Sequence, residues 1–164
     1  HGESCRNQRR KGGNAMDELM KYVFFIYVAS TWAMFGIIWF AQIVHYPLFS
    51  RVGKESFTDY QTANLFLTVL VVIPLQGIEL VTAGLLAWRP PAGILPVQTW
   101  TNLVLIGITW LSTSTLQVPS HFKLSRGYET KIQNRLVYSN WIRTVIWSIR
   151  GGIIFWMLNT LLAA

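Results

Sequence analysis

Residues 22–46 read YVFFIYVASTWAMFGIIWFAQIVHY, and no Asp, Glu, Lys or Arg interrupts this run. A bilayer core about 30 Å thick is crossed by about 20 apolar residues of α-helix, so the run is long enough to span a membrane once. Three later stretches are equally apolar. Glu79 is the only charged residue from position 61 to 88, and positions 90–122 contain none. From position 136 to the end, only Arg143 and Arg150 are charged.

These four stretches predict an all-α, polytopic membrane protein built as a bundle of four transmembrane helices. The runs are too long and too continuously apolar for the strands of a membrane barrel, whose side chains alternate between lipid and lumen. We place the spans at about residues 22–46, 64–88, 97–118 and 136–162. Pro47 and Pro119 are expected to end the first and third spans, because proline removes a backbone hydrogen bond from a helix.

The chain has 164 residues, 52% of them hydrophobic, and a single cysteine. The loops are too short for a separate soluble domain, so residues 22–164 are predicted to form one transmembrane domain. One cysteine makes neither an internal disulfide nor a cysteine metal cage. Residues 1–21 form a polar, basic tail. The sequence Met16-Asp17-Glu18-Leu19 resembles a translation start, so two interpretations of residues 1–15 stay open: a native arm or a non-native extension.

The distribution of basic residues predicts the orientation in the membrane. The four spans are joined by loop one (residues 47–63), loop two (residues 89–96) and loop three (residues 119–135). The tail, loop two and the C-terminus then lie on one side of the membrane, and loops one and three lie on the other. Loops one and three hold Arg51, Lys54, Lys123, Arg126, Lys131 and Arg135. Without the tail, the other side holds only Lys21 and Arg89, so loops one and three are predicted to be cytoplasmic and the termini outside. A native tail would nearly cancel this bias. The net charge of +7 suits anionic lipid headgroups, and we expect no nucleic-acid partner.

Glu79 and Arg150 are the most informative pair, because an ionisable side chain inside a bilayer costs several kcal/mol. At 1.5 Å per residue, Glu79 lies roughly 22 Å and Arg150 roughly 20 Å from the end that carries loops one and three. We therefore predict an intramembrane ion pair between the second and fourth spans. The simpler interpretation is a structural pair that fixes helix rotation. The alternative is a role in catalysis or ligand binding.

A second group of polar residues is predicted near the same membrane face. His45 and His121 end spans that reach this face, so their imidazoles would either share a ligand or simply bond to loop backbone. A haem or chlorophyll bound through His45 or His121 is one expectation, whereas no metal site is expected because no HExxH or CxxC pattern occurs. The full candidate ligand-binding set is Gln42, His45, Gln117, His121, Asn140 and Arg143. Such a set suits an anionic or quinone-like headgroup, or else serves helix packing.

Three motifs are similar to a known family: His45-Tyr46-Pro47, the segment QVPSHFKL at 117–124 and the segment LVYSNWIRT at 136–144. Together they resemble the anthrone-oxygenase-like group of small four-helix membrane proteins, over roughly residues 22–162. The resemblance implies a four-helix bundle and, as for a few relatives, an oxygenase acting on polycyclic phenols without an obvious metal. It assigns no catalytic residue, because a shared fold does not carry function with it.

Two functions are compatible with these observations. The favoured one is a non-catalytic accessory or structural subunit of a larger membrane complex or of a homo-oligomer. The alternative is a membrane-embedded binder or oxygenase of a small aromatic, quinone or porphyrin-like ligand. The two differ in one expectation: a binder keeps an open cavity that ends at the polar residues, whereas a subunit has that space filled. No catalytic motif of high specificity decides whether the protein is an enzyme.

Overall fold

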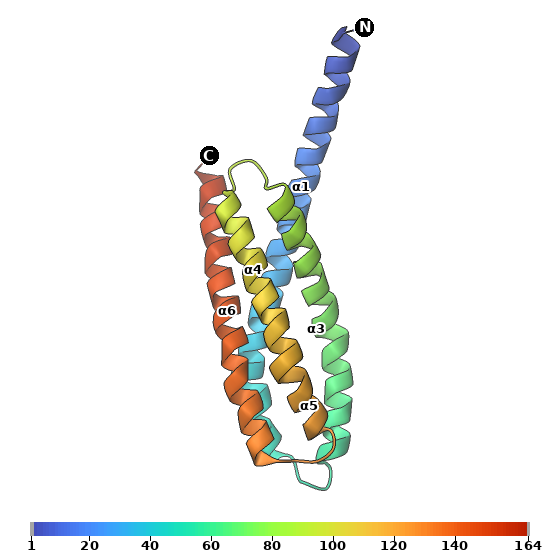
Figure 1. Ribbon diagram of the computed structural model, residues 1–164, viewed down its shortest axis with the longest axis vertical. Helices are drawn as coiled ribbons and strands as arrows, with labels where there is room; N and C mark the ends of the chain where they lie inside the picture. The colour runs from blue at the N-terminus through green and yellow to red at the C-terminus, as the bar shows by residue number, and fades with distance from the viewer. Residues whose placement is uncertain (1, 164) are drawn as a thin grey trace.

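The computed structural model describes residues 16–163 with their side chains. Expectations about the segment before Met16 lie outside these described residues. Four helical rods make up the described chain, 88% of the structure is helical, and the described residues contain no strand (Figure 1). Each rod contains a helix long and apolar enough to cross a membrane. The predicted all-α bundle of four transmembrane helices is thereby confirmed.

Two of the rods are single helices and two are composite. The first span consists of α1 (Gly2–Phe40), η1 (Ala41–His45), α2 (Tyr46–Leu48) and η2 (Phe49–Arg51), and the second span is α3 (Phe57–Trp88). The third span consists of α4 (Pro96–Ser112), η3 (Thr113–Gln117) and α5 (Val118–Leu124), and the fourth span is α6 (Thr130–Leu162).

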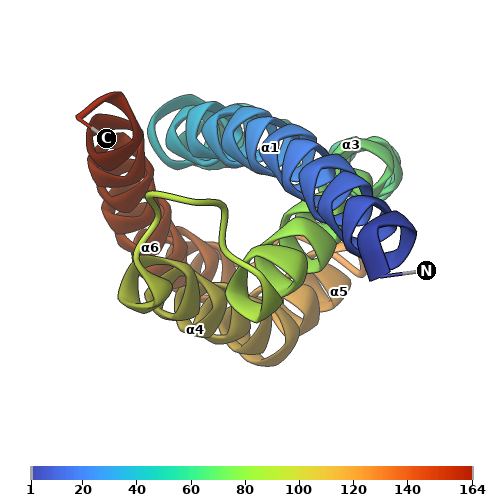
Figure 2. The same ribbon diagram turned by 90° about the horizontal axis from the view of Figure 1, so that it is seen from above.

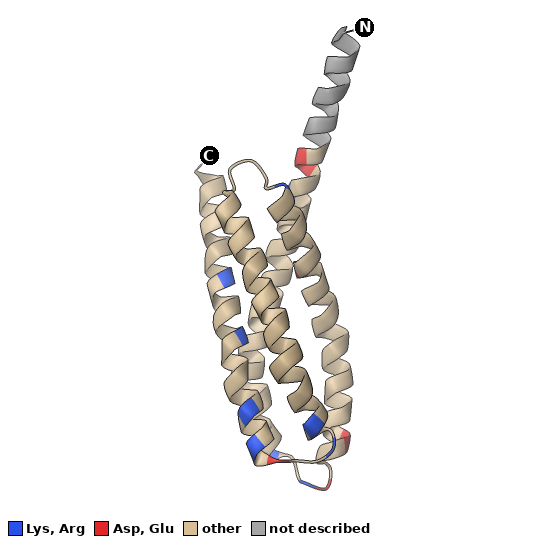
Figure 3. Ribbon diagram, viewed as in Figure 1, with Lys and Arg blue, Asp and Glu red and all other residues tan. Residues whose placement is uncertain are grey.

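The four spans pack in a closed square. α1 contacts α3 and α6, and α4 contacts the same two helices, so the first and third spans are diagonal to each other (Figure 2). Loops one and three lie together at one end of the bundle, and loop two lies at the other end beside the C-terminus (Figure 1). Among the residues that the structure describes, the basic ones are concentrated at the end with loops one and three (Figure 3).

The first and third spans do not end at Pro47 and Pro119, in contrast to the expectation from sequence. A five-residue π-helical turn precedes each proline: the N–H of Tyr46 bonds to the carbonyl of Ala41, and the N–H of Val118 bonds to the carbonyl of Thr113. Each helix then continues, the first to Arg51 and the third to Leu124. A π turn is wider than an α turn, which accommodates the proline ring next to the preceding carbonyls.

The interior alternates between apolar and polar layers. One apolar cluster around Phe24, Leu86 and Ile154 lies toward loop two, and another around Phe49, Phe57 and Leu136 lies toward loops one and three. Between them lie a small cluster of Met34, Ile38 and Trp147 and most of the buried polar side chains. Large apolar residues such as Phe66, Leu111 and Phe155 are exposed on the outside. This distribution fits a bundle surrounded by lipid, where packing and polar contacts hold the helices together.

Candidate functional site

The buried ion pair joins α3 to α6 in the interior of the bundle. Nη2 of Arg150 lies 2.9 Å from Oε1 of Glu79, and the two side chains are 0% and 2% exposed. The prediction that these charges meet across the second and fourth spans is confirmed. α1 adds Thr31, whose Oγ1 accepts a hydrogen bond of 3.3 Å from Nη2 of Arg150. Because an unpaired buried charge is strongly destabilising, the pair favours the helix rotations that bring both groups together.

Trp147 links this pair to the next polar layer. Its Nε1–H donates a 3.3 Å hydrogen bond to Oε1 of Glu79. The guanidinium carbons of Arg150 and Arg143 lie 5.9 Å and 5.4 Å from the centre of its ring. Both cations are therefore within the range of cation–π attraction to one fully buried indole. Arg143 lies one helical turn before Trp147 on α6, and therefore on the side of this indole that faces loops one and three.

A groove opens next to Arg143, bounded by the first span, α3 and the third span. Its volume is about 570 Å³, within the range of about 300–1,000 Å³ that ligand pockets occupy. The lining is mainly apolar and includes Met34, Ile38, Leu65, Val69, Val72 and Phe122. The two π turns contribute to its walls through Ala41 and His45 on one side and Thr113 and Gln117 on the other. π turns are frequent at functional sites.

The polar end of the groove is formed by four of the six candidate residues that the sequence indicated: His45, Gln117, His121 and Arg143. His45 is half-buried and contacts the ring of Phe49 edge-on, with 5.1 Å between ring centres. Nδ1 of His121 lies 2.9 Å from the amide Nε2 of Gln61. When this amide donates, the proton of a neutral imidazole lies on Nε2, which is then the ring nitrogen available to a ligand.

Gln42 and Asn140, the other two candidates, do not line the groove and instead support Arg143 from behind. The amide of Asn140 donates a 2.9 Å hydrogen bond to Oε1 of Gln42, and the amide of Gln42 donates to the carbonyl of Val137 at 3.3 Å. Oδ1 of Asn140 accepts a hydrogen bond of 3.4 Å from Nη1 of Arg143. These contacts occupy both amides, so their role is to position the guanidinium.

Several buried polar atoms at the groove have no protein partner. They are both amide atoms of Gln76, Oε1 of Gln117 and Nε of Arg143. The exposed fractions of these three residues are 1%, 2% and 5%. Leaving a buried donor or acceptor unsatisfied costs about 1–3 kcal/mol, and native proteins leave few such atoms. These atoms are buried behind the groove wall, so a ligand would bond to them once the side chains of Gln76, Gln117 and Arg143 rotate toward the groove.

The surroundings of the two histidines bear on a haem held by both imidazoles. The ring of Tyr46 lies against both imidazoles, with centre distances of 5.7 Å to His45 and 5.8 Å to His121. A porphyrin placed between the two imidazoles would have to displace this buried tyrosine, so a bis-histidine haem does not fit the residues present. Among residues 16–163, no group of three or more His, Cys, Asp or Glu side chains is arranged to hold a metal ion.

Sequence reasoning missed the contribution of α3 to the groove. Asn64, Thr68 and Gln76 line it, and Gln61, which is fully buried, holds His121. The signal was present, because these four polar residues are separated by three, four and eight positions and so share one helix face. The predicted start of the second span at residue 64 left Gln61 in loop one, whereas the helix begins at Phe57.

No family model, no curated protein and no solved structure matches the chain.

Proposed function

We propose that this protein binds a lipophilic small molecule with an oxygen-bearing ring, such as a phenol or a quinone, in the groove between the first, second and third spans. The observation that carries the proposal is the combination of an apolar groove of about 570 Å³ with unpartnered polar atoms at its polar end. Ligand sites typically combine mostly apolar walls with a few polar groups that fix orientation.

The polar atoms suit a ring that carries both carbonyl and hydroxyl oxygens. Nε of Arg143 is a free donor, and Nε2–H of His121 is a second donor when Gln61 holds Nδ1. Oε1 of Gln117 is an acceptor without a protein partner. The amide nitrogen of the same residue donates to Oγ of Ser139 at 2.8 Å, which fixes the orientation of the amide. Two donors and one acceptor would bind a carbonyl oxygen and a phenolic hydroxyl.

The resemblance to the anthrone-oxygenase-like group supports the same class of ligand. An oxygenase acting on a polycyclic phenol is the enzymatic form of this proposal. A role as a subunit of a larger membrane complex or of a homo-oligomer is the competing proposal, in which an apolar helix of a partner would cover the groove. The chain's own side chains do not fill the groove, which supports a ligand over a subunit whose interior is closed by its own side chains.

The test uses the full chain in dodecyl maltoside micelles with 1,8-dihydroxyanthraquinone as the probe, followed by quenching of tryptophan fluorescence. Thr68→Phe places a ring in the groove at a residue outside the set His45, Gln117, His121 and Arg143. Thr62→Phe is the matched control on the exposed part of α3. Both threonines donate a hydrogen bond four residues back, to Oδ1 of Asn64 and to the carbonyl of Thr58 respectively.

We expect saturable quenching with one site per chain, at least 10-fold weaker binding in Thr68→Phe and unchanged binding in Thr62→Phe. A 10-fold change in the dissociation constant corresponds to about 1.4 kcal/mol of binding free energy. Linear quenching without saturation, or equal binding by both variants, would contradict a site in the groove. A stable oligomer to which the probe does not bind would favour the competing proposal.

We also propose that loops one and three face the cytoplasm, on the basis of their excess of basic residues. The test is a single cysteine at position 56 or 125, introduced after Cys5→Ser, and labelled with a membrane-impermeant maleimide in intact cells. Both positions should label only after the membrane is permeabilised. Labelling in intact cells would reverse the orientation.

A further inference from the structure

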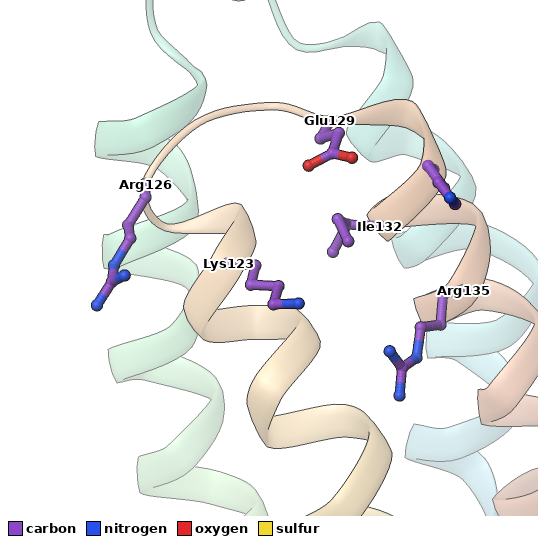
Figure 4. A pocket seen from close by; sticks show the side chains of 6 residues that line it. Lys123, Arg126, Glu129, Ile132 and Arg135 are labelled. Atoms are coloured by element: carbon purple, nitrogen blue, oxygen red, sulfur yellow. The ribbon is translucent and has the colours of Figure 1, made fainter.

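A second pocket lies at the end of the bundle that carries loop three, separate from the groove. It has a volume of about 550 Å³ and lies between α5, loop three and the start of α6. Figure 4 shows Lys123 and Arg135 extending toward each other across the space between the two helices. The residues that line the pocket are Lys123, Arg126, Glu129, Lys131, Ile132 and Arg135.

The charge of this pocket is unbalanced. Four basic residues stand against one carboxylate, a formal charge of +3. The ion pairs of the described residues are Lys21–Glu18, Arg89–Asp17 and Arg150–Glu79, so none of the four basic residues pairs with Glu129. Like charges around one cavity repel each other, and a bound anion would relieve that repulsion.

The backbone adds positive potential at the same place. α6 begins at Thr130 and extends for 33 residues, and its N-cap residue, Glu129, makes no side-chain capping hydrogen bond. The first N–H groups of a long helix carry a partial positive charge and bind anions. Loop three reaches this position through Gly127, whose φ of 151° is a conformation that residues with a Cβ rarely adopt.

The position along the membrane normal limits what this pocket would meet. Lys123 lies one residue before the end of the third span, and Lys131 lies one residue after the start of the fourth. Residues at span ends lie at the level of lipid headgroups, where basic side chains attract anionic phosphates. The two arginines present planar forks of N–H donors, which suit several oxygens of one phosphate better than a single point charge does.

We infer that this pocket is a binding site for a phosphate group at the membrane surface, carried either by an anionic phospholipid or by a soluble phosphate compound. Lys123 and Arg135 would contact the phosphate from α5 and α6. Lys131 in the first turn of α6 and Arg126, whose side chain extends away from Lys123 and Arg135 in Figure 4, would add positive charge at the rim of the pocket. The inference is independent of the groove and of its ligand.

The experiment measures binding to the delipidated full chain in detergent by native mass spectrometry. The probes are dioleoyl phosphatidic acid, dioleoyl phosphatidylcholine and inorganic phosphate. Arg126→Gln combined with Arg135→Gln removes two charges from the pocket. Arg51→Gln combined with Lys54→Gln is the matched control, because it removes two charges from loop one at the same end of the bundle. A second pocket variant, Lys123→Gln with Lys131→Gln, guards against a folding defect in the first.

We expect one molecule of phosphatidic acid per wild-type chain, bound at least 10-fold more tightly than phosphatidylcholine. Each basic residue near an anionic lipid is worth about 1 kcal/mol, so each pocket variant should weaken phosphatidic acid binding about 30-fold while the loop-one control changes little. Inorganic phosphate that binds alone and displaces the lipid, with the same sensitivity to the pocket variants, would assign the site to a soluble phosphate compound. Equal losses in the pocket and control variants, or equal binding of the two lipids, would overturn the inference.

Discussion

The buried ion pair gives the sharpest quantitative prediction. Substituting Glu79→Gln leaves the Arg150 guanidinium without a countercharge, and substituting Arg150→Leu leaves the Glu79 carboxylate with Nε1–H of Trp147 as its remaining donor among the hydrogen bonds described. Both side chains are almost completely excluded from solvent. Water therefore compensates neither loss, and each single substitution should destabilise the bundle.

The structure also indicates how large these losses should be. Breaking a buried pair by removing one partner costs about 3–5 kcal/mol. Glu79→Gln should lie at the lower end, since the amide oxygen still accepts from Trp147 and Arg150, and Arg150→Leu at the upper end. The double variant should recover at least about 2 kcal/mol relative to Arg150→Leu alone, because no charge is then left unpaired.

Unfolding free energies are measured for the full chain by titration from dodecyl maltoside into sodium dodecyl sulfate, followed by far-ultraviolet circular dichroism. The exposed pair Lys21–Glu18 supplies the control. Its Nζ–Oε1 distance of 2.7 Å is shorter than that of the buried pair, yet its side chains are 59% and 60% exposed. Lys21→Met should cause no measurable change, since solvent screens exposed pairs.

Glu79 and Arg150 should be energetically coupled, so the double variant should lose less unfolding free energy than the two single variants lose together. If the losses of the two single variants add up in the double variant, the two groups do not stabilise each other, and their proximity has no energetic meaning. A loss in Lys21→Met as large as that in Arg150→Leu would show that burial does not decide the strength of these pairs.

Three further substitutions test the packing and the polar contacts around the ion pair. Gly151→Leu should destabilise the bundle by about 1–3 kcal/mol through overpacking, because a Cβ added at this position would already lie 3.6 Å from the ring of Trp32. A Cβ added at Gly152 would have no atom within 4 Å, so Gly152→Ala should stabilise the bundle by up to about 1 kcal/mol. The same titration checks both, and equal effects would contradict the packing argument. Tyr27→Phe removes a buried hydroxyl that makes none of the hydrogen bonds described, so its unfolding free energy should be unchanged or higher. A loss above about 1 kcal/mol would contradict this expectation and show that the hydroxyl stabilises the bundle, with the Arg150 guanidinium, 6.0 Å from the ring centre, as the nearest charged group.

Much of the fold follows from the sequence because a bilayer makes hydropathy decisive. Continuous apolar runs leave a helix as the only option for the backbone, and the cost of burying a charge leaves Glu79 and Arg150 few options except each other. Depth along the helices, counted at 1.5 Å per residue, then identified them as partners. Packing details were not needed for either inference.

The groove was harder to predict from the sequence than the spans and the ion pair. Pro47 and Pro119 predict helix ends, whereas the π turns before them allow the helices to continue. A π turn is a local change of hydrogen-bond register that leaves no recognised mark in the sequence. The role of Gln61 was missed for a related reason, because the boundary of an apolar run is not the boundary of a helix.

The π turns also determine which part of the molecule responds to a change in chain length. Each accommodates one extra residue in an otherwise α-helical rod, so the helix beyond it keeps the orientation that it would have in an uninterrupted α-helix one residue shorter. Deleting one residue from Thr113–Gln117 would return this turn to α geometry and leave His121 facing Gln61, so only the residues of the turn itself would change their place on the groove wall. The gain or loss of a single codon at these turns would therefore change the lining of the groove while the rest of the scaffold keeps its arrangement.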